Sequence, residues 1–454
     1  MSYPRVLVVS LARINASDTA NNGFLMRNLF CEWPKENLGQ IYSSGDNGDE
    51  GFFKHYYQLG SQDRQFGNFF YKQKEEALQD QANELRDAHV KTKPSLKTSF
   101  KYFAKKFFVN TGIYELIFRP ILSSKMQSWV NEFQPEIIFA QGYNLTFTWL
   151  PVMLKESTCS RLAFFPTDDW FTYIYSGQHG EPQLFSWLVR YVVKRATSHL
   201  LSNVNIPFAF GQTMTDEYEA RYGIKFITIN HADDPRRFEE ASQHRYHPEG
   251  IFTIVTAGYF NRYRWPLLLD ANECCRLLSY DGIQVRIVVL SAGIDPAGVL
   301  PIADASYIDV VEDPGNELLP QYLKGADLLL LVEGFDEEFV STIRLSVSSK
   351  SHLFMFSHRP IIVYAHQDTG VSNYAAAHEW GRIVTKRDIP TLLVAIRDIL
   401  TYPDEAKHLI SCAKKTSIAF HLLDVNQSRF LNALKGLYIE SFNHNESKNI
   451  DDIN

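Results

Sequence analysis

The chain has 454 residues, of which 45% are apolar and 21% are charged, and its formal net charge is -7. This balance excludes a disordered protein, and an acidic chain lacks the positive field that general nucleic-acid binding requires. Five scattered cysteines without a C-x-x-C pair exclude a disulfide framework and a zinc ribbon. No apolar stretch approaches the ~18 residues of a membrane span, and the first residues do not form a secretory signal. We therefore expect a cytoplasmic protein of two or three domains.

Short β-branched runs alternate with longer amphipathic stretches along the whole chain. Several runs are almost continuously apolar, as expected for parallel strands that are buried on both faces. The predicted strands are 5–12, 137–141, 161–165, 208–211, 226–229, 252–257, 284–290, 307–311, 327–332, 360–364 and 381–384. The predicted helices are 24–33, 184–200, 216–222, 265–278, 317–324, 350–356, 373–378, 391–400 and 404–416. This alternation predicts an α/β protein with doubly wound parallel sheets.

The alternation is interrupted once, by a polar segment without apolar periodicity at 236–250, and it restarts directly afterwards. We expect two Rossmann-like domains, at 1–235 and 251–425, which face a cleft. A C-terminal helix at 426–442 and a polar tail at 443–454 follow.

A basic segment at 91–125 stands out in this acidic chain, because eight Lys and Arg residues against one Glu give it a charge of +7. Aromatic residues such as Phe103, Phe107 and Phe108 interleave with the lysines. A basic amphipathic helix with aromatic anchors can lie on an anionic membrane surface. A solvated helix whose aromatic residues pack on the N-terminal domain explains the composition equally well, so both interpretations stay open.

Several catalytic motifs are missing from the chain. It contains no G-x-G-x-x-G, no G-K-[ST], no H-E-x-x-H and no G-x-S-x-G, which disfavours dehydrogenases, NTPases, zincins and α/β-hydrolases. Neither His244 and His247 nor His352 and His358 have partners at metal-ligand spacing, so we predict no metal site. An α/β protein that binds phosphate without these loops must use helix N-termini and single cations.

The stretch 326–384 contains a buried strand (ADLLLLV), an acidic loop, the segment SSKSHLFMFSHRPII and the loop TGVSNY. It resembles the donor-binding half of retaining, nucleotide-sugar-dependent glycosyltransferases with the GT-B fold, especially glycosyltransferase family 4. In that family an acidic loop is followed by a segment of the type PSKLFEYLAAGRPVI and then by a loop that opens a helix. The similarity extends in order over the second half of the chain.

The resemblance implies a site for the diphosphate of a nucleotide sugar. Lys350 begins a predicted helix, and Gly370, Val371 and Ser372 precede another, so their cation and N–H groups could stabilise the charge that develops on the leaving group. The family motif GRLxxxKG corresponds here to 258–265, where Gly258 is kept and Arg264 takes the place of the lysine, with Arg262 close by. An arginine can bind phosphate through two hydrogen bonds. We expect Arg264 and Lys350 to be catalytic.

The chain departs from the family in one motif, the glutamate pair E-x7-E. The corresponding positions are Leu345 and Leu353. Carboxylates of the loop after the buried strand, Glu333 and Asp336 among them, could bind the sugar hydroxyls instead. A solvated acidic loop is the other interpretation.

The N-terminal half offers candidates for the acceptor side. Asn22 and Gly23 follow the first predicted strand and would face the cleft. Asp168 and Asp169 follow the strand 161–165, where a carboxylate could bind the acceptor or take its proton. Asp168 is the predicted base.

These observations predict a metal-independent glycosyltransferase without a cofactor, whose substrates are a nucleotide-diphosphate sugar and a glycan or lipid-linked acceptor. A lipid-linked acceptor would place the protein at the inner membrane face. The alternatives are a nucleotide-sugar epimerase on the same fold and a non-catalytic partner that binds sugar nucleotides. Fold analogy does not choose among the three.

Overall fold

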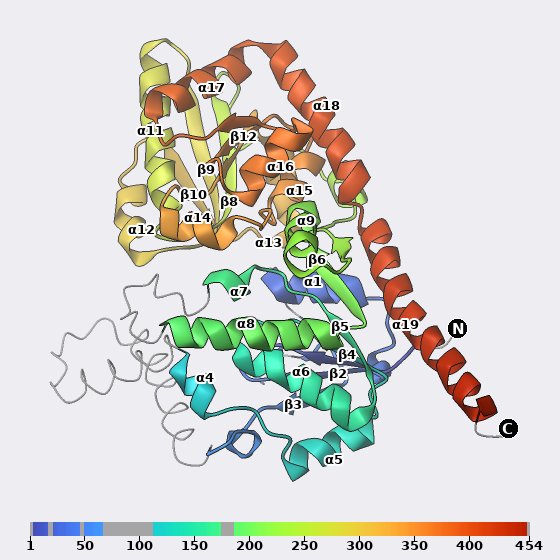
Figure 1. Cartoon of the computed structure of the whole chain (residues 1–454). Helices are drawn as coiled ribbons and strands as arrows, with labels where there is room; N and C mark the ends of the chain where they lie inside the picture. The colour runs from blue at the N-terminus through green and yellow to red at the C-terminus, as the bar shows by residue number, and fades with distance from the viewer. Residues whose placement is uncertain (1–2, 17–20, 46–49, 67–111, 174–185, 452–454) are drawn as a thin grey trace, which may run out of the picture.

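The computed structural model describes residues 3–16, 21–45, 50–66, 112–173 and 186–451, without the side chains of 21, 22, 173, 186 and 439–451. The described part forms two α/β domains, one above the other in Figure 1. The predicted basic segment 91–125 lies outside the described residues as far as residue 111. Within the described part, every helix is too short or too polar to cross a lipid bilayer.

The N-terminal domain is built on a seven-stranded parallel sheet with the order β3-β2-β1-β4-β5-β6-β7. The strands are β1 (Val6–Val9), β2 (Leu38–Tyr42), β3 (His55–Gln58), β4 (Ile137–Ala140), β5 (Arg161–Phe164), β6 (Ile206–Phe210) and β7 (Ile227–Ile229). The helices are α1 (Asn21–Phe30), α4 (Ile113–Ile117), α5 (Ser124–Phe133), α6 (Leu145–Thr158), α7 (Trp170–Tyr173), α8 (Ser186–Asn203) and α9 (Gly211–Tyr222), with the short turns η1 (Lys35–Asn37) and η2 (Ser61–Asp63).

The C-terminal domain has a six-stranded parallel sheet with the order β10-β9-β8-β11-β12-β13. The strands are β8 (Phe252–Phe260), β9 (Val285–Ile294), β10 (Ile308–Glu312), β11 (Leu328–Val332), β12 (Ile361–Tyr364) and β13 (Arg382–Val384). The helices are α10 (Arg236–Glu239), α11 (Trp265–Tyr280), α12 (Pro296–Ala303), α13 (Gly315–Gly325), α14 (Glu337–Ile343), α15 (Ser351–Phe356), α16 (Gly370–His378), α17 (Ile389–Thr401) and α18 (Pro403–Phe420).

The amino-acid composition of the central strands explains why they are buried. The central strands β1 and β11 consist of the runs VLVV and LLLLV, and all of their residues are buried. Such runs suit parallel strands because helices cover both faces of the sheet. Some of the helices begin where a polar side chain accepts a hydrogen bond from a free N–H group of the first turn. Asn144 does this for α6, Thr369 for α16 and Asp388 for α17.

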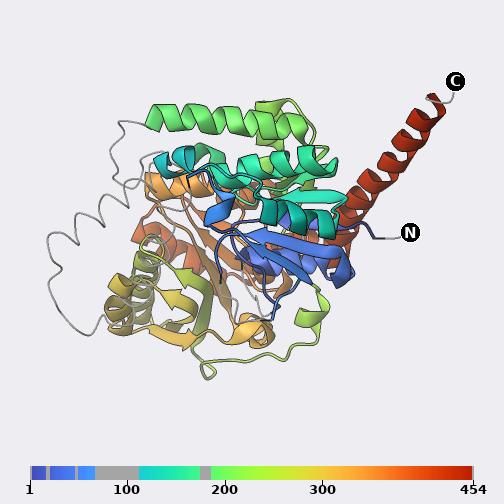
Figure 2. The same cartoon turned by 90° about the horizontal axis from the view of Figure 1, so that it is seen from below.

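The last helix returns the chain to the first domain. α19 (Leu423–Asp451) follows α18 in the direction of the N-terminal sheet (Figure 1), and its end extends beyond the body of the molecule (Figure 2). The ring of Phe430 packs 5.1 Å from that of Phe30, 5.5 Å from that of Phe139 and 5.3 Å from that of Phe208. The chain thus crosses between the domains twice, and residues of α19 complete the N-terminal core.

All eleven predicted strands are present, and the α/β class with two doubly wound parallel sheets is confirmed. The sequence analysis missed β2 and β3. β2 (LGQIY) carries a glycine because a Cβ atom at Gly39 would lie 3.1 Å from the Phe133 ring, and β3 (HYYQ) is an edge strand with little apolar character. The part assigned to a polar tail from residue 443 is helical as far as Asp451.

Candidate active site at the ends of strands β8 and β11

Four of the predicted donor residues lie together where the order of the C-terminal sheet reverses. β8 is the first strand of this sheet in sequence, and its neighbours are β9 on one side and β11 on the other. Gly258 is in the last part of β8, Arg264 precedes α11, Glu333 directly follows β11 and Lys350 precedes α15. In open α/β sheets, ligands bind at the carboxyl ends of the strands beside such a reversal.

Arg264 and Glu333 form a buried ion pair at this point. The guanidinium group donates from Nε to Oε2 of Glu333 over 2.7 Å, and a second nitrogen lies 2.6 Å from the same oxygen. The side chain of Glu333 is 3% exposed and that of Arg264 is 18% exposed. The arginine also lies over the ring of Phe339 at 5.5 Å. A pair of this kind holds the guanidinium plane in one orientation.

Lys350 places a second cation beside this pair. Burial of the ammonium group, together with the nearby charge of Arg264, lowers the pKa of Lys350 to about 8, although Glu333 acts in the opposite direction. The side chain passes so close to Gly258 that a Cβ atom there would lie 2.1 Å from Cε of Lys350. Gly258 also has a φ of +128°, which L-residues rarely adopt. The glycine therefore makes room for the lysine.

Two cations against one carboxylate leave this cluster with a net charge of +1 while Lys350 is protonated. The cations are already desolvated and fixed, so an anion that enters need not reorganise them. A diphosphate would also favour the protonated form of Lys350, since an opposite charge nearby raises the pKa of an ammonium group.

The other predicted donor residues lie on further segments of the C-terminal domain. Arg262 is exposed and 3.4 Å from Glu338, and Asp336 is exposed at the start of α14. Gly370, Val371 and Ser372 begin α16, where the hydroxyl oxygen of Thr369 accepts from the N–H group of Ser372. A Cβ atom at Gly370 would lie 2.5 Å from the carbonyl oxygen of Ser346, and Gly370, Val371 and Ser372 are all buried, so the segment 344–350 covers this helix end.

On the N-terminal side of the interface, Asp168 lies across from the segment 344–350. Its carboxylate accepts a hydrogen bond from the Ser346 hydroxyl over 3.1 Å. Burial raises the pKa of Asp168, and the bond from Ser346 offsets part of this effect. The phenol of Tyr143 is buried nearby and lies 2.5 Å from the Thr167 hydroxyl. A carboxylate with a raised pKa is a better base near neutral pH.

The neighbouring Asp169 has a different environment. Its carboxylate accepts hydrogen bonds from Tyr218 over 2.8 Å, from Arg221 over 3.1 Å and from Thr172 over 2.7 Å. Arg221 continues to Glu217, which also meets Arg344 of the other domain at 3.3 Å. Asp169 thus connects α7 to α9, and α9 in turn contacts the segment 344–350 through Glu217 and Arg344.

The segment 344–350 is held between the domains by more than hydrogen bonds. Leu345, one of the two positions where the family has glutamate, is 2% exposed and belongs to the N-terminal core. Leu353, the other position, packs against the C-terminal core. An open cavity of about 380 Å³ adjoins this segment and is lined by Arg344, Leu345 and Asn373 together with residues of α9.

Sequence reasoning missed Tyr143 and Ser346. Tyr143 has a φ of +88° at the end of β4, and non-glycine residues with positive φ are enriched at functional sites. The only signal in the sequence is its position after a buried strand. Asn22 and Gly23 lie in the first turn of α1, which faces the C-terminal domain in Figure 1, and the Asn22 side chain is outside the described residues.

No protein-family model and no curated protein sequence matches the chain. Solved structures with the same architecture match almost its whole length. Sucrose-phosphate synthase from Thermosynechococcus elongatus has a TM-score of 0.62 at 13% identity, covering 96% of this chain and 99% of its own. HepE from Anabaena in complex with UDP has 0.59 at 10% identity, covering 95% and 100%. WaaG, a glycosyltransferase involved in lipopolysaccharide biosynthesis, has 0.54 at 12% identity, covering 95% and 100%. At these identities the likeness shows the fold, and it confirms the expected GT-B architecture.

Proposed function

We propose that this chain, a protein with the GT-B fold, is a glycosyltransferase that moves a sugar from a nucleotide-diphosphate sugar to a glycan or glycolipid acceptor. The observation that carries the proposal is the cluster of Arg264, Lys350 and Glu333 at the ends of β8 and β11. A related fold was solved with UDP-glucose bound, that of HepE, which supports a nucleotide sugar as the ligand.

In the proposed reaction the diphosphate lies against Arg264 and Lys350. Charge builds up on the diphosphate as the bond to the sugar breaks, and the two cations stabilise this charge in the transition state. Two fixed cations supply what a divalent ion supplies in other transferases, so the transfer is metal-independent. Glu333 holds Arg264 in place and does not react.

The acceptor lies on the side of Asp168. Its carboxylate binds the acceptor hydroxyl and takes the proton as the new bond forms, and Tyr143 and Thr167 form the polar wall beside it. The transfer retains the configuration of the sugar, as in the family that the C-terminal half resembles, so the acceptor oxygen bonds to the anomeric carbon on the same face from which the diphosphate leaves. Ser346 and the acceptor hydroxyl would occupy the same space beside Asp168. The hydrogen bond between Ser346 and Asp168 must therefore open before the acceptor enters.

The proposal is tested with a panel of labelled nucleotide sugars, without acceptor and with a metal chelator present. A transferase slowly hydrolyses its own donor under these conditions and releases the nucleoside diphosphate. Conversion of one nucleotide sugar into another would establish an epimerase. Binding without either reaction would establish a non-catalytic partner. The anomer released from the accepted donor, followed by NMR, tests retention.

We further propose that the protein acts at an anionic membrane surface. The outward face of α8 supports this proposal: Trp187 is 70% and Tyr191 is 54% exposed, and the basic residues Arg190, Lys194 and Arg195 are exposed on a helix without an acidic residue. α8 lies at the outer edge of the molecule in Figure 2. Aromatic and basic residues on one helix face are suited to the interface of an anionic bilayer.

Sedimentation with phosphatidylglycerol vesicles tests the membrane proposal. Binding should weaken as salt rises, because each basic residue contributes on the order of 1 kcal/mol at low ionic strength. Changing Lys194 and Arg195 together to Glu should abolish binding, whereas Lys415→Glu on the exposed face of α18 should leave it unchanged. Wild-type protein that stays in the supernatant at low salt would contradict the proposal.

A further inference from the structure

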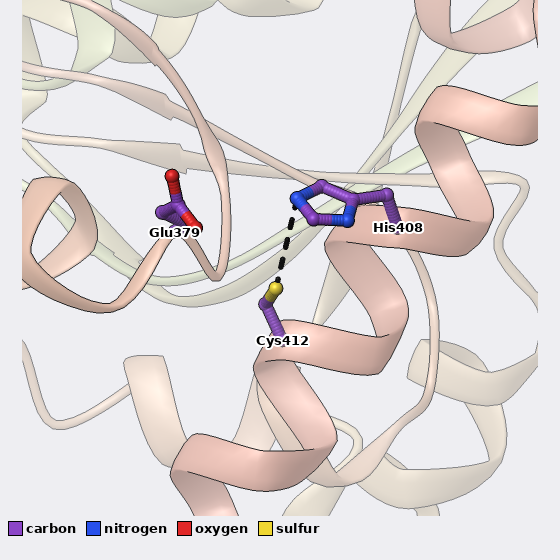
Figure 3. Close-up of side chains that lie close together, drawn as sticks. All are labelled: Glu379, His408 and Cys412. Carbon is purple, nitrogen blue, oxygen red and sulfur yellow. Dashed lines mark hydrogen bonds between the residues drawn. The ribbon is translucent and has the colours of Figure 1, made fainter.

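We infer that Glu379, His408 and Cys412 form a binding site for a zinc-class divalent metal ion on the surface of the C-terminal domain. One ligand atom from each residue can be chosen so that all three lie within 4.8 Å of one another. Figure 3 shows His408 and Cys412 pointing from one helix toward Glu379. The site is independent of the proposed function, since none of the three residues belongs to the cluster around Lys350.

The helix geometry of α18 accounts for two of the ligands. His408 and Cys412 are four residues apart, so their side chains lie on the same face of the helix. Nε2 of His408 is 3.8 Å from Sγ of Cys412. In a tetrahedral zinc site, bond lengths of ~2.3 Å to sulfur and ~2.0 Å to nitrogen separate these atoms by about 3.5 Å. The pair therefore needs almost no movement to bind one ion.

Glu379 comes from a different helix, α16, and its backbone is held in position beside α18. It caps α16 in the left-handed conformation with a φ of 55°, and its N–H group donates to the carbonyl of Ala375. Two contacts fix this region against α18: the ring of His378 lies 5.0 Å from that of Phe420, and Arg382 donates to Glu405 over 2.8 Å. Only the exposed Glu379 side chain must move, by about 1 Å, to complete the site.

The donor set selects the class of metal. One thiolate, one imidazole and one carboxylate suit zinc and cobalt, whereas magnesium and calcium prefer oxygen ligands. With thiolate and carboxylate charged, the three residues neutralise a divalent ion. Glu379 and His408 are exposed and Cys412 is partly exposed, so water can take the fourth position. The bound ion would join the end of α16 to α18, which gives it a structural role.

Titration of the reduced, untagged protein with Co²⁺ tests the inference, because a thiolate ligand produces a charge-transfer band and tetrahedral geometry intensifies the visible bands. We expect both signals at one ion per chain, competition by Zn²⁺ and no competition by a large excess of Mg²⁺. Cys412→Ser should remove the charge-transfer band, and His408→Ala and Glu379→Gln should each weaken binding at least tenfold.

The chain supplies matched controls for the thiol. Cys31 and Cys159 are also exposed, but they lie in the N-terminal domain away from α18. Cys31→Ser and Cys159→Ser should therefore leave the band and the affinity unchanged. All three ligands lie at the surface, and circular dichroism checks that each variant remains folded. A wild-type protein without the band, or a band that persists in Cys412→Ser, would overturn the inference.

Discussion

The two sides of the domain interface differ in how their polar groups are held. On the C-terminal side, Arg264, Glu333 and Lys350 all come from the C-terminal domain: Arg264 and Glu333 form an ion pair, and the charges of both act on Lys350. On the N-terminal side, Asp168 bonds to Ser346 of the other domain. The cluster on the C-terminal side is thus preformed, whereas Asp168 on the N-terminal side would lose its partner Ser346 if the domains separated.

This difference suggests an order of events for the proposed transfer. A preformed cation cluster can bind a diphosphate in any arrangement of the two domains. The acceptor carboxylate becomes available only when the segment 344–350 leaves it. We therefore expect the nucleotide sugar to bind first, and the contacts of Arg344 and Ser346 with the N-terminal domain to open as the acceptor enters.

The largest effect is expected at the donor side, from Lys350→Ala. The variant removes a cation that faces developing negative charge, so turnover should fall about a hundredfold or more. Wild-type kcat/KM should also decline above about pH 8, because Lys350 loses its proton there, and the variant should lack this alkaline limb. Rates measured across pH, with Lys415→Ala as the control of equal charge, check both points.

Retention of more than half of the activity by Lys350→Ala would contradict the placement of the diphosphate. Arg264→Ala is a less clean test than Lys350→Ala. It leaves the buried Glu333 carboxylate without its partner, and breaking a buried pair costs about 3–5 kcal/mol of stability. Its activity must therefore be compared with that of a double variant that also carries Glu333→Gln.

The next largest effect is expected on the acceptor side, from Asp168→Asn. The amide cannot take the acceptor proton, so kcat should fall about a hundredfold while donor binding stays unchanged. Steady-state rates with a saturating donor, together with calorimetric titration of the nucleotide, separate the two quantities. A variant that loses donor affinity instead would show that Asp168 contributes to donor binding. The assignment of donor and acceptor to opposite sides of the interface would then be wrong.

A third prediction concerns three histidines between the two domains: the buried His352 stacks on the buried His421 and on the half-buried His231. The ring of His352 lies 5.7 Å from that of His231 and 5.9 Å from that of His421. Burial lowers the pKa of His231 to about 3 and that of His421 to about 4, and it also lowers that of His352. The unfolded chain, with histidine pKa near 6.5, therefore takes up protons first as the pH falls.

Stability should accordingly be constant above about pH 6.5 and should fall below it, by about 2 kcal/mol per histidine between pH 7 and pH 5. His352→Phe keeps a ring of similar size and removes one titrating group, so it should flatten this decline. Urea unfolding at several pH values measures both slopes. Equal slopes in the variant and the wild type would show that His352 does not contribute.

The smallest effect is expected from Gly258→Ala. The added Cβ atom would meet Cε of Lys350, and alanine disfavours the φ of +128° at this position. Because the flexible lysine can move aside, we expect a change in donor affinity of about tenfold, or ~1.4 kcal/mol. Nucleotide titration of the variant checks this value. An unchanged affinity would mean that the position of Lys350 is not critical.

The difference between the two sides of the interface also explains which parts of the fold and of the candidate site could be predicted from the sequence. The strands with continuous apolar runs and the residues at their ends were found, since both follow from local order in the chain. β2 was missed because it contains Gly39, which packs against the ring of Phe133, a contact that the sequence does not reveal. β3 was missed because it is an edge strand and carries polar residues. Tyr143 and Ser346 were missed because their surroundings depend on how the domains meet. Of the proposed metal ligands, His408 and Cys412 stand four residues apart, a spacing that the sequence analysis did not single out, whereas Glu379 is distant in the sequence and lies beside them only because α16 packs near α18.

Calorimetric titration of the protein with UDP, GDP and ADP, in the presence of a metal chelator, shows whether the cluster of Arg264, Glu333 and Lys350 binds a nucleoside diphosphate. We expect one of these nucleotides to bind with a stoichiometry of one. Its affinity should fall at least tenfold in Lys350→Ala and remain unchanged in Lys415→Ala. Binding that requires a divalent ion, equal affinity in wild type and Lys350→Ala, or no binding of any nucleoside diphosphate would contradict the claim that the cluster at the ends of β8 and β11 binds the donor.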